Sequence, residues 1–116
     1  MTIEQLYIAI EECYEDMLNR FASPERITKY VKMFSADDSF SQLESALSEK
    51  NYELAFRMVH TLKGVSANLG FMKLFDKSVV LTELLRAKQY DADLLTPFNN
   101  IKTEYKKIVE LIPQLS

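Results

Sequence analysis

The chain has 116 residues, 47% of them hydrophobic and 27% charged, which fits one globular domain over residues 1–116 with a core of its own. The 17 acidic and 14 basic side chains give a net charge of −3 without a basic stripe, so nucleic acid is a poor candidate partner. A single cysteine excludes an internal disulfide and fits the reducing cytoplasm. No apolar run approaches the roughly 20 residues of a membrane span. We therefore expect a cytoplasmic protein without a membrane segment, and we expect it to be a monomer.

The first predicted helix covers residues 2–20. Thr2 and Gln5 form a capping-box pattern at its start, and apolar residues then recur at helical spacing. Cys13 falls within this apolar stripe, so we interpret it as a small core residue. Residues 1–22 are therefore assigned to one additional N-terminal helix. Its stripe consists of Ile3, Leu6, Ile10, Cys13, Tyr14, Met17 and Phe21.

Two shorter helices are predicted next. The first covers residues 24–34, because Ser23 suits the N-cap and Pro24 the first helical position. The second follows a polar turn and has Ser39 or Ser41 as its cap. The residues expected to be buried by these two helices are Ile27, Tyr30, Val31, Phe34, Phe40, Leu43, Ala46 and Leu47.

A central helix and two more helices complete the chain. Asn51 can cap the start of the central helix, and Gly70 suits the left-handed position just after its end. The next helix covers residues 71–88, and the last begins at Asp91 or Asp93. The inward faces of these last two helices carry Phe71, Leu74, Phe75, Ser78, Leu81, Thr82, Leu85, Leu94, Phe98, Ile101, Tyr105, Ile108 and Ile112.

This series of helices predicts an all-α fold. Two glycines and three prolines are few, which disfavours a protein of strands and turns and suits long helices. The links between the helices are short, so neighbouring helices are expected to be antiparallel. The predicted architecture is an antiparallel up-and-down four-helix bundle, with the additional N-terminal helix packed across it.

The only histidine, His60, lies on the central helix almost opposite its apolar stripe. Helical spacing surrounds it with an aromatic ring, two cations and two residues that have almost no side chain. Gly64 is unusual among them, because an exposed glycine within a helix costs about 1 kcal/mol relative to alanine. The predicted neighbours of His60 are Phe56, Arg57, Lys63, Gly64 and Ala67.

Other chemistries lack the residues that they need. One histidine and one cysteine cannot form a zinc or transition-metal site of the usual kind, so no metal is expected. Two glycines cannot supply a glycine-rich phosphate loop for ATP. A nucleophilic pair of Cys13 and His60 is disfavoured, because the first is assigned to the core and the second to the surface. We therefore expect no cofactor and no independent catalysis.

A phosphoryl group is what this surface could carry. Neutral imidazole is a nucleophile whose pKa lies near physiological pH. Lys63, one turn along the helix, can reach a phosphoryl group on the histidine, and Arg57 adds positive charge from the other side. Gly64 gives a partner close access, and Phe56 and Ala67 offer it an apolar surface. A lone exposed histidine is also an ordinary solvated residue, and the residues alone leave both interpretations open.

The sequence VHTLKG at residues 59–64, followed by NLG at residues 68–70, resembles the signature of histidine-containing phosphotransfer (HPt) domains. The similarity extends over roughly residues 24–112, which leaves the N-terminal helix outside it. Val59 stands where this family commonly has alanine, and Asn51 stands where it often has an acidic residue. Neither difference touches the proposed acceptor chemistry.

The resemblance implies a phosphocarrier of a His-Asp phosphorelay, without an ATP site or a kinase domain of its own. His60 would accept a phosphoryl group from a receiver-domain aspartate or a kinase and pass it to a receiver, and Lys63 would support it electrostatically. The implied partners are response-regulator receiver domains, a sensor histidine kinase, or both. The alternative is a binding-only helical module that docks such proteins without relaying phosphate. The residues expected to contact a partner are Phe56, Arg57, Gly64, Ala67 and Asn68.

Overall fold

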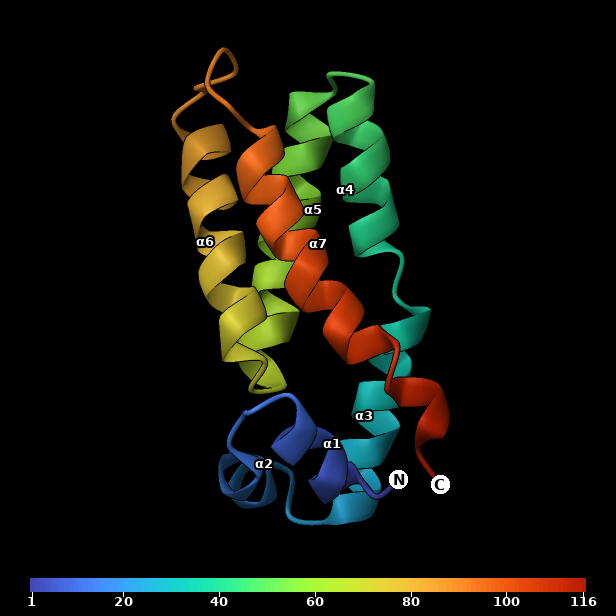
Figure 1. The fold of residues 1–116 in the computed structure, drawn as a ribbon. Coiled ribbons are helices and arrows are strands. Elements are labelled where there is room, and N and C mark those ends of the chain that lie inside the picture. The colour runs from blue at the N-terminus through green and yellow to red at the C-terminus, as the bar shows by residue number, and fades with distance from the viewer.

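A computed structural model describes all of residues 1–116 and contains helices but no strands (Figure 1). The elements are α1 (Ile3–Ala9), α2 (Tyr14–Phe21), α3 (Pro24–Ala36), α4 (Ser39–Ser48), α5 (Tyr52–Asn68), α6 (Met72–Arg86), α7 (Leu95–Val109) and the short 3₁₀ helix η1 (Ile112–Gln114). None of these helices combines the length and the hydropathy of a membrane span.

The helices α4, α5, α6 and α7 form an up-and-down bundle (Figure 1). Helix α5 packs against both α4 and α6, and α6 packs against α7. The bundle closes between α4 and α7, where the Phe40 ring stacks on Phe98 and on Tyr105 with centroids 5.5 and 4.2 Å apart. Helices α5 and α7 therefore lie on a diagonal of the bundle. The predicted all-α four-helix bundle is confirmed.

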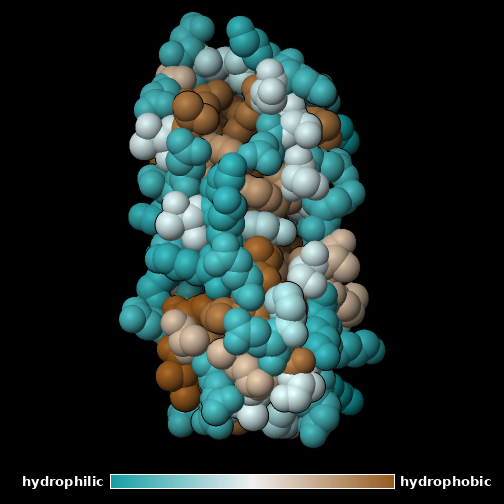
Figure 2. All heavy atoms as spheres, turned by 45° about the vertical axis from the view of Figure 1, so that its right-hand side comes forward, coloured by the Kyte–Doolittle hydropathy of each residue, from teal (hydrophilic) through white to brown (hydrophobic).

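The core is one continuous cluster of 23 buried hydrophobic residues. Besides Ser39, three buried hydroxyl side chains lie inside, and each donates a hydrogen bond to the carbonyl oxygen four residues earlier at 2.7 or 2.8 Å. No buried side-chain polar atom lacks a partner, so burial of these hydroxyls leaves no unpaired group. These residues are Ser66, Ser78 and Thr82. Hydrophilic residues cover most of the face shown in Figure 2, and hydrophobic ones gather near its upper end and in its lower third.

The remaining elements form a second layer at one end of the bundle. Helices α1, α2 and α3 pack on one another there, and η1 contacts α3 (Figure 1). The two chain ends meet in this layer, where the Met1 ammonium donates to the Gln114 carbonyl at 2.9 Å and the Ser116 N–H donates to the Met1 carbonyl at 3.0 Å.

The prediction of one helix over residues 2–20 is wrong. Thr2 caps α1 through the predicted capping box, but α1 ends at Ala9 and α2 begins at Tyr14. Glu11, between them, has a left-handed backbone with φ 59°, which reverses the chain. The break also overturns the prediction for Cys13, which lies at the start of α2 and is exposed.

Two smaller predictions in the next segment also change. The Tyr30 side chain, expected in the core, is 37% exposed because it lies on the outer face of α3. Helix α4 has Asp38 at its N-cap, and the predicted cap Ser39 is its first helical residue. The Asp37 side chain accepts a hydrogen bond from the Ser39 N–H at 2.8 Å. An aspartate therefore bonds the backbone at the start of this helix, where a serine was expected to do so.

The buried tyrosine Tyr7 ties α1 to the end of α5. Its hydroxyl donates a 2.6 Å hydrogen bond to the Leu69 carbonyl oxygen. Desolvation by burial raises the pKa of this phenol above its ordinary value, and the Glu12 carboxylate raises it further. The folded state therefore keeps the phenol protonated. The contribution of this phenol to the stability of the fold is fully present below about pH 10 and is lost as the pH rises further.

Replacing Tyr7 with phenylalanine is expected to lower the free energy of unfolding by about 1–3 kcal/mol at pH 8, because the buried Leu69 carbonyl loses its donor. The difference in the free energy of unfolding between the variant and the wild type should shrink above pH 10. At that pH the folded wild type must keep its Tyr7 phenol protonated, and the variant has no such phenol. Urea denaturation of both chains at pH 8 and at pH 10.5 measures this. A difference that is constant across this pH range would contradict the role of the phenol.

Candidate functional site

Helix α5 presents His60 to solvent because its opposite face is buried. The Asn51 side chain accepts a hydrogen bond from the Leu54 N–H at 3.3 Å and caps the start of the helix, as predicted. Gly70, with φ 71°, follows its end, and the N–H groups of Gly70 and Phe71 bond the last turn. The buried residues of α5 are Ala55, Val59, Leu62 and Ser66, which leaves His60 exposed.

The imidazole has an aromatic neighbour on its α6 side. The rings of His60 and Phe56 lie 5.9 Å apart between centroids and are inclined by 27°. The Arg86 guanidinium from α6 lies 5.6 Å from the centre of the Phe56 ring, and it also pairs with Glu83. The Phe56 ring is thus held between the imidazole and a cation of the neighbouring helix. Sequence reasoning missed Arg86, because no local spacing connects it to His60.

Gly64 lies one turn beyond His60 and opens the surface there. A Cβ atom added to it would have no neighbour within 4 Å, and its backbone is not left-handed. Neither packing nor backbone conformation therefore requires glycine at this position. The absence of a side chain affects only what approaches from outside.

Two predicted cations flank the imidazole without a carboxylate partner. Lys63 is partly buried and Arg57 is exposed, and neither takes part in an ion pair. Helical rotation of about 100° per residue places Lys63 on the same side as Phe56, toward α6, and Arg57 with Gly64 on the other side. The imidazole therefore lies between two positive charges, which favour an anion at this surface.

The predicted partner contacts continue along α5 to Ala67 and Asn68. Ala67 is half-buried and Asn68 is exposed. The Asn68 side chain makes no hydrogen bond within the chain, whereas the carbonyl oxygens of both residues accept from Nη1 of Arg20, at 3.0 Å for Ala67 and 2.5 Å for Asn68. Arg20 comes from α2, and nothing in the sequence indicated that it reaches α5.

The structure offers no cluster of three or more histidine, cysteine, aspartate or glutamate side chains that could hold a metal ion. A cavity of about 510 Å³ lies at the far end of the bundle beside Tyr52 and Tyr90, and His60 does not line it. The candidate site is thus an exposed convex surface, suited to a macromolecular partner rather than to a small enclosed ligand.

A comparison with protein-family models matches residues 32–111 to the Hpt domain. The chain belongs to the Hpt domain family. Hpt domains are histidine phosphotransfer modules of two-component systems, and they interact with receiver domains and kinases in phosphorelays. They are phosphocarriers without a catalytic kinase domain. Searches of curated proteins and of solved structures give no significant match.

The matched segment covers the end of α3 and all of α4 to α7. It begins within α3, so α1, α2 and the first two turns of α3 lie outside it. The sequence predicted a similarity that begins a little earlier, near residue 24. This Hpt domain therefore carries an N-terminal addition to the part that the family model describes.

Proposed function

We propose that this Hpt domain is the phosphocarrier of a His-Asp phosphorelay and that His60 is its acceptor. The observation that supports this is the exposed imidazole in the middle of α5, with open space over Gly64 and the unpaired cations Lys63 and Arg57 beside it. His60 is also the only histidine of a chain in a histidine phosphotransfer family. The roles below follow from this proposal.

The transfer needs a nucleophile, charge compensation and access. A ring nitrogen of neutral His60 attacks the phosphorus of an aspartyl phosphate, the N–P bond forms, and the bond to the aspartate oxygen breaks. The aspartate leaves as a carboxylate, and the reverse reaction delivers the group to a receiver. Enzymatic phosphoryl transfer depends mainly on positioning and electrostatic stabilisation, so a convex surface suffices if the partner completes the site.

Each flanking residue has a part in this transfer. The Lys63 ammonium supports the phosphoryl oxygens, and Arg57 raises the positive potential on the opposite side. The Phe56 ring, fixed by Arg86, gives the partner an apolar surface beside the imidazole. Gly64 lets the backbone of the partner approach within contact distance. A glycine at this position also makes the helix less stable than an alanine would.

Transfer profiling tests the function. Each receiver domain of the source organism is phosphorylated with a radioactive label and mixed with the chain, and transfer is followed over seconds to minutes. We expect at least one receiver to label the chain, with a label that is lost in acid and retained in alkali, as a phosphoramidate is. Stable binding to receivers without transfer would favour the binding-only module.

Replacing Lys63 with alanine is expected to slow transfer by about 10–100-fold, because a hydrogen bond to a charged group is worth about 1.5–3 kcal/mol. Docking should change less than threefold, since Lys63 supports the phosphoryl group rather than the partner surface. Stopped-flow transfer rates and receiver binding by calorimetry measure the two effects. Lys63→Arg keeps the charge and is the matched control. Unchanged transfer kinetics in Lys63→Ala would remove Lys63 from the mechanism.

A further inference from the structure

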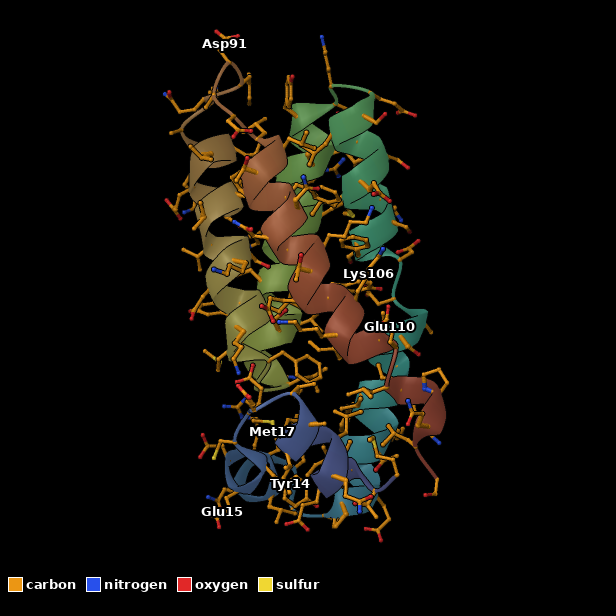
Figure 3. The ribbon with its side chains drawn as sticks, viewed as in Figure 1. Tyr14, Glu15, Met17, Asp91, Lys106 and Glu110 are labelled. Atoms are coloured by element: carbon orange, nitrogen blue, oxygen red, sulfur yellow. The ribbon has the colours of Figure 1, made fainter.

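The N-terminal addition contacts the end of α5, the helix that carries His60. The Tyr7 hydroxyl bonds the Leu69 carbonyl, and Met17 of α2 lies against Gly70, where an added Cβ would come within 2.6 Å of its Cε. Figure 3 shows Met17 beneath the end of α5 and the start of α6. The position of α2 relative to α5 is therefore fixed by contacts, and its side chains lie at defined places beside the candidate site.

Arg20 of α2 places a third cation on the His60 side of the molecule. Its Nη1 bonds the carbonyl oxygens of Ala67 and Asn68, two of the terminal carbonyls that an α-helix leaves without a backbone donor. No carboxylate pairs with Arg20, and its guanidinium is exposed. Asn68 lies eight residues beyond His60, about 12 Å along the helix axis. The Arg20 guanidinium bonds the carbonyl oxygens at that end of the helix, so it lies roughly 15 Å from His60 along the helix axis.

An apolar hollow lies next to this cation, between α3 and α5. It has a volume of about 190 Å³ and is bordered by Tyr30 and Met33 on one side and by Val65 and Asn68 on the other. Tyr30 is 37% and Met33 57% exposed. The Tyr30 ring is also held by Phe21 of α2, with centroids 5.1 Å apart. We call Arg20, Tyr30 and Met33 the N-terminal shelf.

The partner that acts on His60 has the size to reach this shelf. A specific interface covers about 800 Å² on each partner, which corresponds to a disc of roughly 16 Å radius. By the rise along α5, the shelf begins near the edge of such a disc centred on His60. A receiver that brings its acceptor aspartate to His60 brings negative charge with it. Three unpaired cations, Arg57, Lys63 and Arg20, face this approach in a chain whose net charge is −3.

Acidic groups also lie near this surface. Asp16 lies one turn before Arg20 on α2, but no ion pair joins the two side chains. Asp37 borders the hollow, and its carboxylate accepts from the Ser39 N–H at 2.8 Å. Glu53 lies two turns before His60, at the opposite end of α5 from the shelf. The shelf thus combines a cation that has no carboxylate partner with exposed apolar side chains, which is the composition of interface anchors, where arginine and aromatic residues are enriched.

We propose that the N-terminal shelf is a second part of the receiver-docking surface, with Arg20 binding a carboxylate of the receiver and Met33 packing against an apolar side chain. This proposal rests on the proposed function of His60. Because Arg20 and Tyr30 lie outside the residues that the family model matches, the shelf selects among receivers rather than serving transfer itself. It is a specificity element added to a common phosphotransfer surface.

The test compares Arg20→Gln and Met33→Ser with the wild type, using the receiver that labels the wild type fastest. We expect the KM for the phosphorylated receiver to rise about 5–20-fold in Arg20→Gln and about 3–10-fold in Met33→Ser, with kcat unchanged, as for anchor residues of an interface. The KM of Arg20→Gln should also depend less on salt. Arg20→Lys should restore most of the affinity, and Lys106→Gln on α7, diagonally opposite, is the matched control.

Phosphoramidate serves as a small donor that needs no docking surface. All variants should be labelled by it at the wild-type rate, which shows that α5 and His60 are intact. If no receiver labels the wild type, the proposed function fails. If a receiver labels it but the KM values of Arg20→Gln and Met33→Ser equal that of Lys106→Gln, the shelf is refuted while the function stands. A fall in kcat or in phosphoramidate labelling of Arg20→Gln would identify Arg20 as a positioning residue and overturn its docking role.

Discussion

Replacing His60 with glutamine is expected to abolish receiver-dependent labelling, to less than about 1% of the wild-type level. Glutamine retains polar atoms and a similar reach, but its amide is not a nucleophile toward phosphorus. Because His60 is exposed and makes no hydrogen bond in the chain, the free energy of unfolding should change by no more than about 0.5 kcal/mol. Loss of transfer in a folded protein would therefore report the chemistry of the imidazole alone.

The measurement is radioactive transfer from a labelled receiver, together with urea denaturation of both chains. Thr61→Ala, the adjacent exposed position, is the matched control and should retain transfer. The glutamine variant should still bind the receiver, since the partner also contacts Phe56 and the surface over Gly64. Label that persists in His60→Gln would place the acceptor elsewhere and overturn the assignment.

Much of the fold could be predicted from local signals. The caps Thr2, Ser23 and Asn51 start their helices as predicted, and Gly70 ends α5. These features depend on residues within a few positions of one another, and so the sequence carries them directly. The exposure of His60 follows in the same way from the apolar period of one helix.

The errors arose where distant contacts decide the local structure. Nothing near Glu11 indicates a helix end, since a residue other than glycine adopts the left-handed conformation there. The break is stabilised from 60 residues away: the Glu12 carboxylate accepts from the Lys73 N–H at 3.0 Å, and the Lys73 ammonium donates to the carbonyl oxygens of Ile10 and Glu11. Reciprocal bonds of this kind between the α1–α2 connection and α6 leave no periodic pattern in the sequence.

The site shows the same division between near and distant contacts. Phe56, Arg57, Lys63 and Gly64 lie within one turn of His60, and helical spacing alone placed them around it. Arg20 and Arg86 come from other helices, and only the packing of α2 and α6 on α5 brings them there. A single helix thus encodes the surroundings of the proposed acceptor, and the packing of the fold adds the two arginines.

Replacing Gly70 with alanine is expected to lower the free energy of unfolding by about 2–4 kcal/mol. Its φ of 71° is a left-handed conformation that costs an L-residue about 1–2 kcal/mol. The added Cβ would also lie 2.6 Å from the Met17 Cε, and forcing a methyl group into a packed site costs about 1–3 kcal/mol. The flexible Met17 side chain can yield, which keeps the sum below its upper limit. The loss is large beside a typical total stability of about 5–15 kcal/mol.

Gly64→Ala is the matched control, because this glycine lies inside α5 and has neither a left-handed backbone nor a neighbour within 4 Å of an added Cβ. It should raise the free energy of unfolding by about 0.5–1 kcal/mol, so the two substitutions should act in opposite directions. Urea denaturation of both variants measures this, and Gly70→Ala combined with Met17→Ala separates backbone strain from the clash. Equal changes in the free energy of unfolding at the two glycines would contradict the close contact between α2 and the end of α5.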